Sequence, residues 1–229
     1  MPLSKCNCEG CELKGLFFSE LTNDEIEAVC TWKDERSYKK GEYILREGDP
    51  IKEFCYTKTG LVKLVRSVSD QEEQIIYFAS SLDFISLLGI FSNDTYPYSV
   101  VAIEDTVVCS LRISEVKTFI RTNGNFAFSV IQKLNRVSDN IITTNLEIKR
   151  RRLPGRIAYI LLYFANDIYK HTTFELPVSR KEIADFIGMT TENVIRTLSE
   201  FRRDGIIKIS GKTIEIVDMD KLLKIKQFG

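Results

Sequence analysis

The chain has 229 residues, of which 44% are hydrophobic and 28% are charged. This is the size of one large domain or two ordinary ones, and the composition excludes collagen, simple disorder and a disulfide miniprotein. The longest nearly apolar run, residues 157–165, is far below the ~20 residues needed to cross a bilayer, and the first ten residues lack the apolar core of a signal peptide. We therefore expect a cytoplasmic protein with no membrane partner.

The formal net charge of zero conceals an asymmetry along the chain. Residues 1–149 carry 17 basic and 22 acidic side chains, whereas residues 150–229 carry 15 basic and 10 acidic ones. The basic end suggests contact with phosphate, and the alternative is a chance gradient of solvated surface charge.

Three of the six cysteines lie close together at the start of the chain, at Cys6, Cys8 and Cys11. Intracellular cysteines more often stay reduced, bind metal or sense redox state than form bridges. Soft thiolates in a C-x-C-x2-C arrangement suit an iron-sulfur cluster or zinc. A thiol redox sensor and an unliganded arm, residues 1–15, are the alternatives.

Residues 16–122 are expected to form the first folded domain. The apolar stretch 16–21 precedes a helix that begins near Thr22 and places Ile26, Val29 and Cys30 on one face. From residue 34 to residue 112 the sequence changes to short strands rich in Val, Ile, Tyr and Phe, separated by turn residues. Regular short strands of this kind predict a sandwich or barrel.

The segment 123–149 predicts a long helix with an apolar seam. The positions of this seam recur at alternating steps of three and four residues. This spacing is typical of a coiled coil and therefore predicts a dimer interface. The alternative is a helix that packs on its own β domain. The residues of the predicted dimer interface are Ala127, Val130, Leu134, Val137, Ile141, Thr144 and Ile148.

A domain boundary is expected between residues 149 and 150. The basic run 149–152 is followed by Pro154 and Gly155, which predict a turn. Residues 150–229 then contain a helix at 156–167, two further helices, and a hairpin with strands at 206–209 and 213–217. Three helices and a hairpin are the layout of a winged helix.

A helix-turn-helix is predicted within residues 179–205. Ser179 and Glu182 have the spacing of a capping box, Gly188 makes the turn, and Thr190 caps the second helix. Burial of the apolar positions of the second helix leaves an outward face that can enter a DNA major groove. That face consists of Thr191, Glu192, Ile195, Arg196, Ser199 and Arg203. The alternative is two packed helices with a solvated polar face.

These residues carry a resemblance to a known family. Residues 178–196, VSRKEIADFIGMTTENVIR, and the wing residues 211–214 resemble the cyclic-AMP receptor protein and fumarate-nitrate regulator (Crp-Fnr) family. Residues 40–49, KGEYILREGD, with Tyr56 and the segment 60–63 resemble its β-roll. The resemblance implies an α+β fold with an N-terminal double-stranded β-helix (jelly-roll, cyclic-nucleotide-binding-like), a long dimerisation helix, and a C-terminal winged helix-turn-helix.

The resemblance also implies roles in DNA binding. Glu192 and Arg196 match the base-reading positions, Arg180 matches a phosphate contact, and Lys212 matches a wing contact. The chemistry agrees, because Arg pairs with guanine and Glu accepts from cytosine, so that both can read one G·C step. Thr191 stands where the cyclic-AMP branch has Arg, and Ile195 can touch a thymine methyl. The expected DNA-binding set is Ser179, Arg180, Thr190, Thr191, Glu192, Ile195, Arg196 and Lys212.

The effector pocket of the cyclic-AMP branch is altered in this sequence. Its Gly-Glu pair matches Ser86 and Leu87, its Arg-Ser pair matches Tyr98 and Ser99, and its Thr-Ser pair matches Ile141 and Ile142. The missing carboxylate and guanidinium remove the charge-assisted bonds to a cyclic nucleotide. We therefore predict that cyclic AMP is not the ligand, and that the β-roll holds another small ligand or none.

The cysteines match the oxygen-sensing branch in part. Cys8, Cys11 and Cys109 match three of its four cluster ligands, while the fourth position holds Phe17, for which Cys6 can substitute. Cys109 is alternatively a small buried residue, as it is in family members without a cluster. Haem is a weaker option, because the only histidine, His171, lies in the DNA-binding half.

The sequence therefore predicts a homodimeric, sequence-specific transcription regulator that is controlled by an N-terminal sensor of redox state, oxygen, nitric oxide or a small ligand. Its partners are double-stranded DNA, a second copy of the chain and, for an activator, RNA polymerase. The rival is a ligand-binding module whose helix-turn-helix serves protein contact. An enzyme is not expected, because the chain has one histidine, no Gly-rich phosphate loop and no H-E-x-x-H motif.

Overall fold

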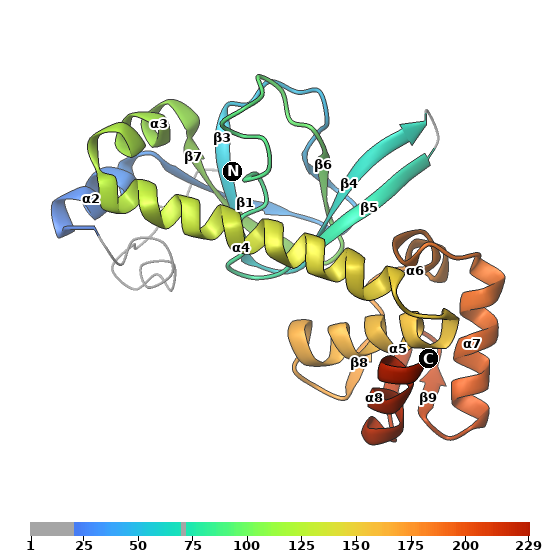
Figure 1. Ribbon diagram of the computed structural model, residues 1–229. Helices are drawn as coiled ribbons and strands as arrows, with labels where there is room; N and C mark the ends of the chain where they lie inside the picture. Colours follow the sequence, from blue (N-terminus) through green and yellow to red (C-terminus); the bar gives the residue numbers. More distant parts are fainter. Residues whose placement is uncertain (1–20, 70–71) are drawn as a thin grey trace. The chain divides into compact units, whose positions relative to one another are not determined.

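The computed structural model describes residues 21–69 and 72–229 (Figure 1). Their contacts divide the chain into two compact units, Met1–Ile141 and Ile142–Gly229. This division falls inside the long helix α4 (Gly124–Lys149), whereas the sequence predicts a boundary after residue 149. No helix in the described part of the chain is long and apolar enough to cross a membrane.

The N-terminal unit is built from two antiparallel sheets and flanking helices. One sheet has the strand order β1-β7-β3 and the other has the order β2-β6-β4-β5, which confirms the predicted β domain. Its elements are α2 (Asn23–Thr31), β1 (Lys33–Tyr38), β2 (Tyr43–Leu45), β3 (Glu53–Thr59), β4 (Val62–Ser69), β5 (Glu72–Ala79), β6 (Ser99–Ala102), β7 (Thr106–Arg112), α3 (Ile113–Thr122) and α4. Helix α3 is not predicted by the sequence analysis.

Helix α2 begins at the predicted cap. The Thr22 hydroxyl accepts a hydrogen bond from the Glu25 amide, and the Glu25 carboxylate accepts one from the Thr22 amide at 2.8 Å. This backbone donor, together with the Asn123 side chain, lowers the pKa of Glu25. Asn123 Nδ2 donates to Glu25 Oε1 at 2.7 Å, while Asn123 Oδ1 accepts from the Phe126 amide at 2.9 Å. One asparagine therefore fastens the start of α4 to α2.

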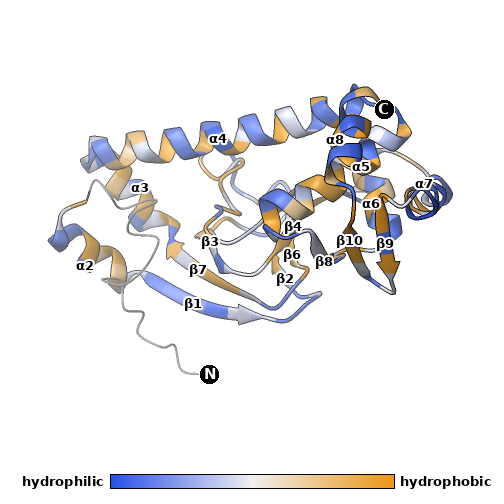
Figure 2. Cartoon of the chain, turned by 90° about the horizontal axis from the view of Figure 1, so that it is seen from below, coloured by the Kyte–Doolittle hydropathy of each residue, from blue (hydrophilic) through white to orange (hydrophobic). Residues whose placement is uncertain are grey.

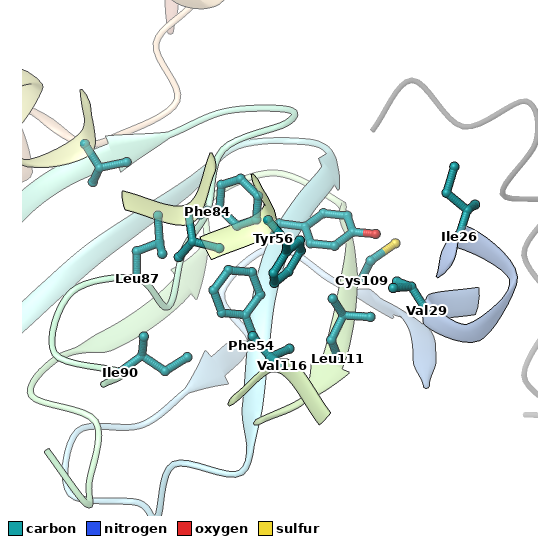
Figure 3. Packing of buried hydrophobic residues seen from close by; sticks show 13 residues of the cluster. Ile26, Val29, Phe54, Tyr56, Phe84, Leu87, Ile90, Cys109, Leu111 and Val116 are labelled. Carbon is teal, nitrogen blue, oxygen red and sulfur yellow. The ribbon is translucent and has the colours of Figure 1, made fainter. Parts of the chain in front are cut away.

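Alternating residues of β3 and β7 face two separate cores. Phe54 and Tyr56 of β3 pack with Cys109 of β7 and with residues of the helices, as Figure 3 shows. Cys55 and Val108 point to the opposite side of the same strands and pack with residues of the other sheet. This period of two is the geometry of a strand that is covered on both faces.

Helix α4 packs against this unit through the face that the sequence assigns to a dimer. Figure 2 shows hydrophobic and hydrophilic residues alternating along the helix. Val130 and Val137 are buried in the core around Phe54, and Leu134 and Ile141 pack against it. Between Val130 and Ile141 the predicted seam thus makes an intramolecular contact, which was the alternative interpretation. The sequence left both options open because a heptad pattern does not distinguish the chain's own sheet from a second copy. The outer members of the seam are half-buried Ala127 and Thr144 and buried Ile148.

The C-terminal unit has the winged-helix layout with additional elements. Beyond the end of α4 it contains α5 (Leu153–Tyr163), the π-helix η1 (Phe164–Ile168), β8 (Thr173–Glu175), α6 (Arg180–Ile187), α7 (Thr191–Arg203), β9 (Ile207–Ser210), β10 (Thr213–Ile216) and α8 (Met219–Phe228). The predicted hairpin is β9 and β10, and β8 adds a third strand in the order β8-β10-β9. Neither β8 nor α8 is predicted by the sequence analysis.

Pro154 and Gly155 do not form the predicted turn but lie in the first turn of α5. Proline fits there because the first helical amides need no partner within the helix. Gly155 is buried, and a Cβ at this position would lie 2.5 Å from the carbonyl oxygen of Gly229. The position has no room for a side chain, which explains a glycine in a helix.

Candidate nucleic-acid interface

Helix α6 has the predicted beginning and end. The Ser179 hydroxyl accepts from the Glu182 amide at 3.2 Å, and the Glu182 carboxylate accepts from the Ser179 amide at 2.8 Å. Gly188 ends the helix with a φ of 66°, a left-handed conformation that glycine adopts without strain. The chain then turns directly into α7.

Helix α7 is oriented by the apolar face that it buries. Thr190 caps the helix by accepting from the Asn193 amide at 3.3 Å. Val194, Leu198 and Phe201 are buried, as the spacing predicts. The opposite face is left open to solvent, and Figure 2 shows α7 as mainly hydrophilic.

The predicted base-reading residues share this open face. Glu192 and Arg196 are exposed, Ile195 is 52% exposed, and Thr191 is half-buried. The Arg196 guanidinium donates to Asn193 Oδ1 at 2.9 Å, so its orientation is already restricted. The pKa of Glu192 is lowered by its own backbone amide and then by the Thr190 side chain.

The wing is tied to the helix-turn-helix within the same unit. Arg180, at the start of α6, donates to the carbonyl of Gly211 in the turn between β9 and β10 at 3.4 Å. The amide of Leu176 donates to the carbonyl of Lys212 at 2.9 Å, while the Lys212 side chain is exposed. The structure therefore brings two of the predicted phosphate-contacting residues to the same edge of the wing.

A groove of about 660 Å³ lies beside the start of α7. Several of its residues carry basic or hydrogen-bonding groups that the sequence analysis does not assign to DNA binding. The basic run 149–152 is the sequence signal for two of them, Arg151 and Arg152. The lining residues are Arg151, Arg152, Leu153, Arg156, Ala184, Asp185, Gly188, Met189, Thr190 and Asn193.

The predicted effector positions are mainly packed inside the N-terminal unit. The Ser86 hydroxyl accepts from the Cys55 amide at 2.7 Å, and the Tyr98 hydroxyl donates to the carbonyl of Ile85 at 3.0 Å. Ser99 accepts from the Glu47 amide at 2.9 Å. Leu87 is 1% exposed, and burial raises the pKa of Tyr98.

The last two predicted effector positions, Ile141 and Ile142, lie on different sides of α4. Ile141 packs against both cores of the N-terminal unit, whereas Ile142 is 57% exposed. The structure therefore does not bring all six expected positions to one pocket.

Of the four predicted metal ligands, the structure describes Cys109, whereas Cys6, Cys8 and Cys11 lie outside the described residues. Cys109 is fully buried, and its Sγ lies 3.9 Å from Glu35 Oε2. The same carboxylate oxygen accepts from Lys58 Nζ at 2.7 Å. Among residues 21–69 and 72–229, no group of three or more His, Cys, Asp or Glu side chains is placed to hold a metal ion.

Comparison with known proteins agrees with this architecture. Residues 35–123 match the cyclic nucleotide-binding domain, and residues 155–225 match the Crp-like helix-turn-helix domain. The transcriptional activator protein Anr of Pseudomonas aeruginosa is 26% identical over 226 residues, which is 96% of this chain and 92% of that protein. The transcriptional activator protein FnrL of Cereibacter sphaeroides is 26% identical over 88% of this chain and 84% of its own length.

A solved structure supports the same assignment. FixK2 from Bradyrhizobium japonicum is 26% identical and superposes with a TM-score of 0.75, over 84% of this chain and 96% of that one. The described units thus occur in the order that the sequence resemblance implies, and the family consists of DNA-binding proteins rather than enzymes. The chain belongs to the Crp-Fnr family of transcription regulators, in which an N-terminal sensing domain controls a C-terminal helix-turn-helix.

Proposed function

We propose that this protein is a homodimeric transcription regulator that reads an inverted-repeat operator with α7 and responds to a signal other than cyclic AMP. The observation that supports DNA binding is the open face at the start of α7, where the exposed residues Glu192 and Arg196 lie one turn apart. A helix lying in the major groove meets base edges with the residues of its first turns. Arg196 would donate to guanine O6 and N7, and Glu192 would accept from cytosine N4.

The proposed phosphate contacts surround this face. Arg180 and Lys212 lie at the wing, and the groove beside α7 adds the exposed side chain of Arg152 and the hydroxyl of Thr190. These groups can bind the DNA backbone without reading its sequence. The excess of basic residues beyond residue 149 supports this arrangement.

The dimer is proposed to form through the outward face of α4. Phe128, Ile131, Ile142 and Leu146 are 61%, 52%, 57% and 61% exposed, although all four are apolar. Together with Asn135 and Ser138 they follow steps of three and four residues, which place them on one side of a continuous helix. A second copy of α4 is the proposed occupant, because such a repeat is the seam of a two-stranded coiled coil.

The signal is proposed not to be cyclic AMP, because neutral groups occupy the expected binding positions. The hydroxyls of Ser86, Tyr98 and Ser99 are already bonded to the protein backbone. A cyclic phosphate entering there would lose its water without gaining a charged partner.

A metal or cluster on cysteines of the arm is the second proposal for the signal site, and the sequence predicts Cys6, Cys8, Cys11 and Cys109 as its ligands. The surroundings of Cys109 do not favour it, because this thiol is fully buried and its Sγ already donates to Glu35 Oε2 at 3.9 Å. Cys109 fits a small buried residue better than a ligand, which leaves the three cysteines of the arm as the candidates.

DNA reading is tested with Arg196→Ala and Lys212→Ala. Arg196→Ala should weaken the free energy of binding to the operator by about 1–3 kcal/mol, because a bidentate base contact is lost. It should also relax the preference at one G·C pair. Lys212→Ala should weaken binding to all sequences about equally and reduce the salt slope by about one. Selection from random DNA and binding at several salt concentrations measure both effects.

Lys224→Ala, an exposed position on α8, serves as the control and should leave the salt slope unchanged. The base-reading assignment fails if the Arg196→Ala protein selects the wild-type half-site with undiminished preference at every position.

The dimer face is tested with the double substitution of Ile131 and Ile142 by Glu. Two like charges on each copy would meet across the seam, so sedimentation should show monomers. Asn140→Glu adds a charge at an exposed position on another side of the same helix and should leave the dimer intact. A dimer that survives the double substitution would show that copies associate through another surface.

Titration calorimetry tests the proposal on cyclic AMP. We expect no binding below ~1 mM, an affinity weaker than about −4 kcal/mol, because the pocket lacks both charged partners of the nucleotide. Micromolar binding to the wild-type protein would overturn the interpretation of Ser86, Leu87, Tyr98 and Ser99.

The thiol proposal is tested on anaerobically purified protein by visible absorption and by iron, sulfide and zinc analysis. Cys8→Ser and Cys11→Ser should each abolish any bound metal, since a thiolate ligand is lost outright. Cys109→Ala should retain the wild-type metal content. Loss of metal on Cys109→Ala would make it a ligand, and metal-free wild-type protein would favour an unliganded arm.

A further inference from the structure

Two arginines of the C-terminal unit connect the end of α4 to the turn of the helix-turn-helix. Arg151 lies just beyond α4 and is 6% exposed. Its guanidinium donates to the backbone carbonyl and to the carboxylate of Glu147 in the last turn of α4. Its Nε donates to the carbonyl of Lys226 in α8 at 2.7 Å. Arg151 therefore fixes the last turn of α4 to α8.

Arg156, in the first turns of α5, continues the connection. Its Nε donates to the carbonyl of Arg151 at 2.9 Å. Its Nη1 donates to the carbonyls of Ile187 and Gly188, at 3.0 and 3.3 Å. These carbonyls end α6, where the helix dipole favours a cation, and α7 begins three residues after Gly188.

We propose that Arg151 and Arg156 are positioning residues, which hold the recognition helix at a set angle to the end of α4 and thereby set DNA affinity without touching DNA. The inference rests on the proposed function, in which α7 reads DNA and α4 forms the dimer. In a dimer, two copies of α7 must fit two half-sites at a fixed distance. The joint between α4 and α7 is therefore where each copy sets that distance.

The geometry separates this role from phosphate binding, although both arginines line the groove beside α7. Nε and Nη1 of Arg156 are directed at carbonyl oxygens of the protein, and Arg151 is buried with its donors engaged. Arg152, between them in sequence, has an exposed side chain and is the residue that a phosphate can reach. A guanidinium also holds several carbonyls in a fixed planar fork, which the single ammonium of a lysine does not reproduce.

The experiment compares Arg156→Met and Arg156→Lys with the wild-type protein on an operator obtained by selection from random DNA. Affinity, salt slope and base preference are measured on this operator and on versions whose half-sites are one base pair closer or farther apart. Arg156→Met should lower affinity about three- to thirtyfold with the salt slope and base preferences unchanged. Arg156→Met should also reduce the loss of affinity on operators with altered half-site spacing, because a loosened joint lets α7 adjust to the new distance. Arg156→Lys should show smaller effects of the same kind.

The second connection is tested through the pair of Glu147 and Arg151. The double variant Glu147→Gln with Arg151→Met avoids leaving a lone buried charge and should also relax the spacing preference. Arg150→Met is the matched control, because Arg150 pairs with the same Glu147 at 3.0 Å but is exposed, and surface ion pairs contribute little. It should leave spacing preference and affinity unchanged. Thermal unfolding establishes that each variant is folded.

Each outcome decides the proposal. A salt slope that falls by about one in Arg156→Met would mean that Arg156 contacts phosphate, and the positioning role would be wrong. Folded variants with wild-type affinity and spacing preference would also overturn it. Arg152→Ala should differ from both, with weaker binding to all sequences and a slope reduced by about one. If the wild-type protein selects no operator, the proposed function itself fails, and that result is distinct from a failure of the joint.

Discussion

The packing of one face of α4 against the β1-β7-β3 sheet is the contact on which the arrangement of the N-terminal unit depends. Val130 and Val137 reach the core that Phe54 and Cys109 form on that side of the sheet. Successive side chains are spaced at a fixed angle around a helix, so the burial of these two residues also determines which side chains point outward. The exposed apolar stripe that begins at Phe128 therefore follows from the intramolecular packing of the opposite face.

The helix-turn-helix was predictable because its signals are local. A capping box, a glycine in the left-handed conformation and apolar residues three and four apart each act over a few residues, so that the boundaries of α6 and α7 follow from sequence. The same holds for the outward face with Glu192 and Arg196. The short strands of the N-terminal unit were also predictable as a class, since alternation and turn residues are local too.

The features that the sequence missed depend on contacts between distant segments. The apolar spacing of α4 is equally compatible with a β sheet or a second helix as its partner, so the sequence left open whether Val137 packs in the core of its own chain, as it does here. Gly155 was interpreted as a turn residue, yet its lack of a side chain serves the close approach of Gly229. The roles of Arg151 and Arg156 were not visible either, because their partners are backbone carbonyls up to 75 residues away.

The carbonyls of Ile187 and Gly188, which end α6, make the helix-turn-helix depend on a residue outside it. The helix-turn-helix looks self-contained in sequence, with its own caps and its own apolar face, but the end of its first helix receives its cation from Arg156, more than twenty residues before α6 begins. Transplanting residues 179–205 alone into a relative would leave these carbonyls to whatever side chain the host provides. A segment exchanged between relatives keeps the cation at these carbonyls only if it extends back to include Arg156.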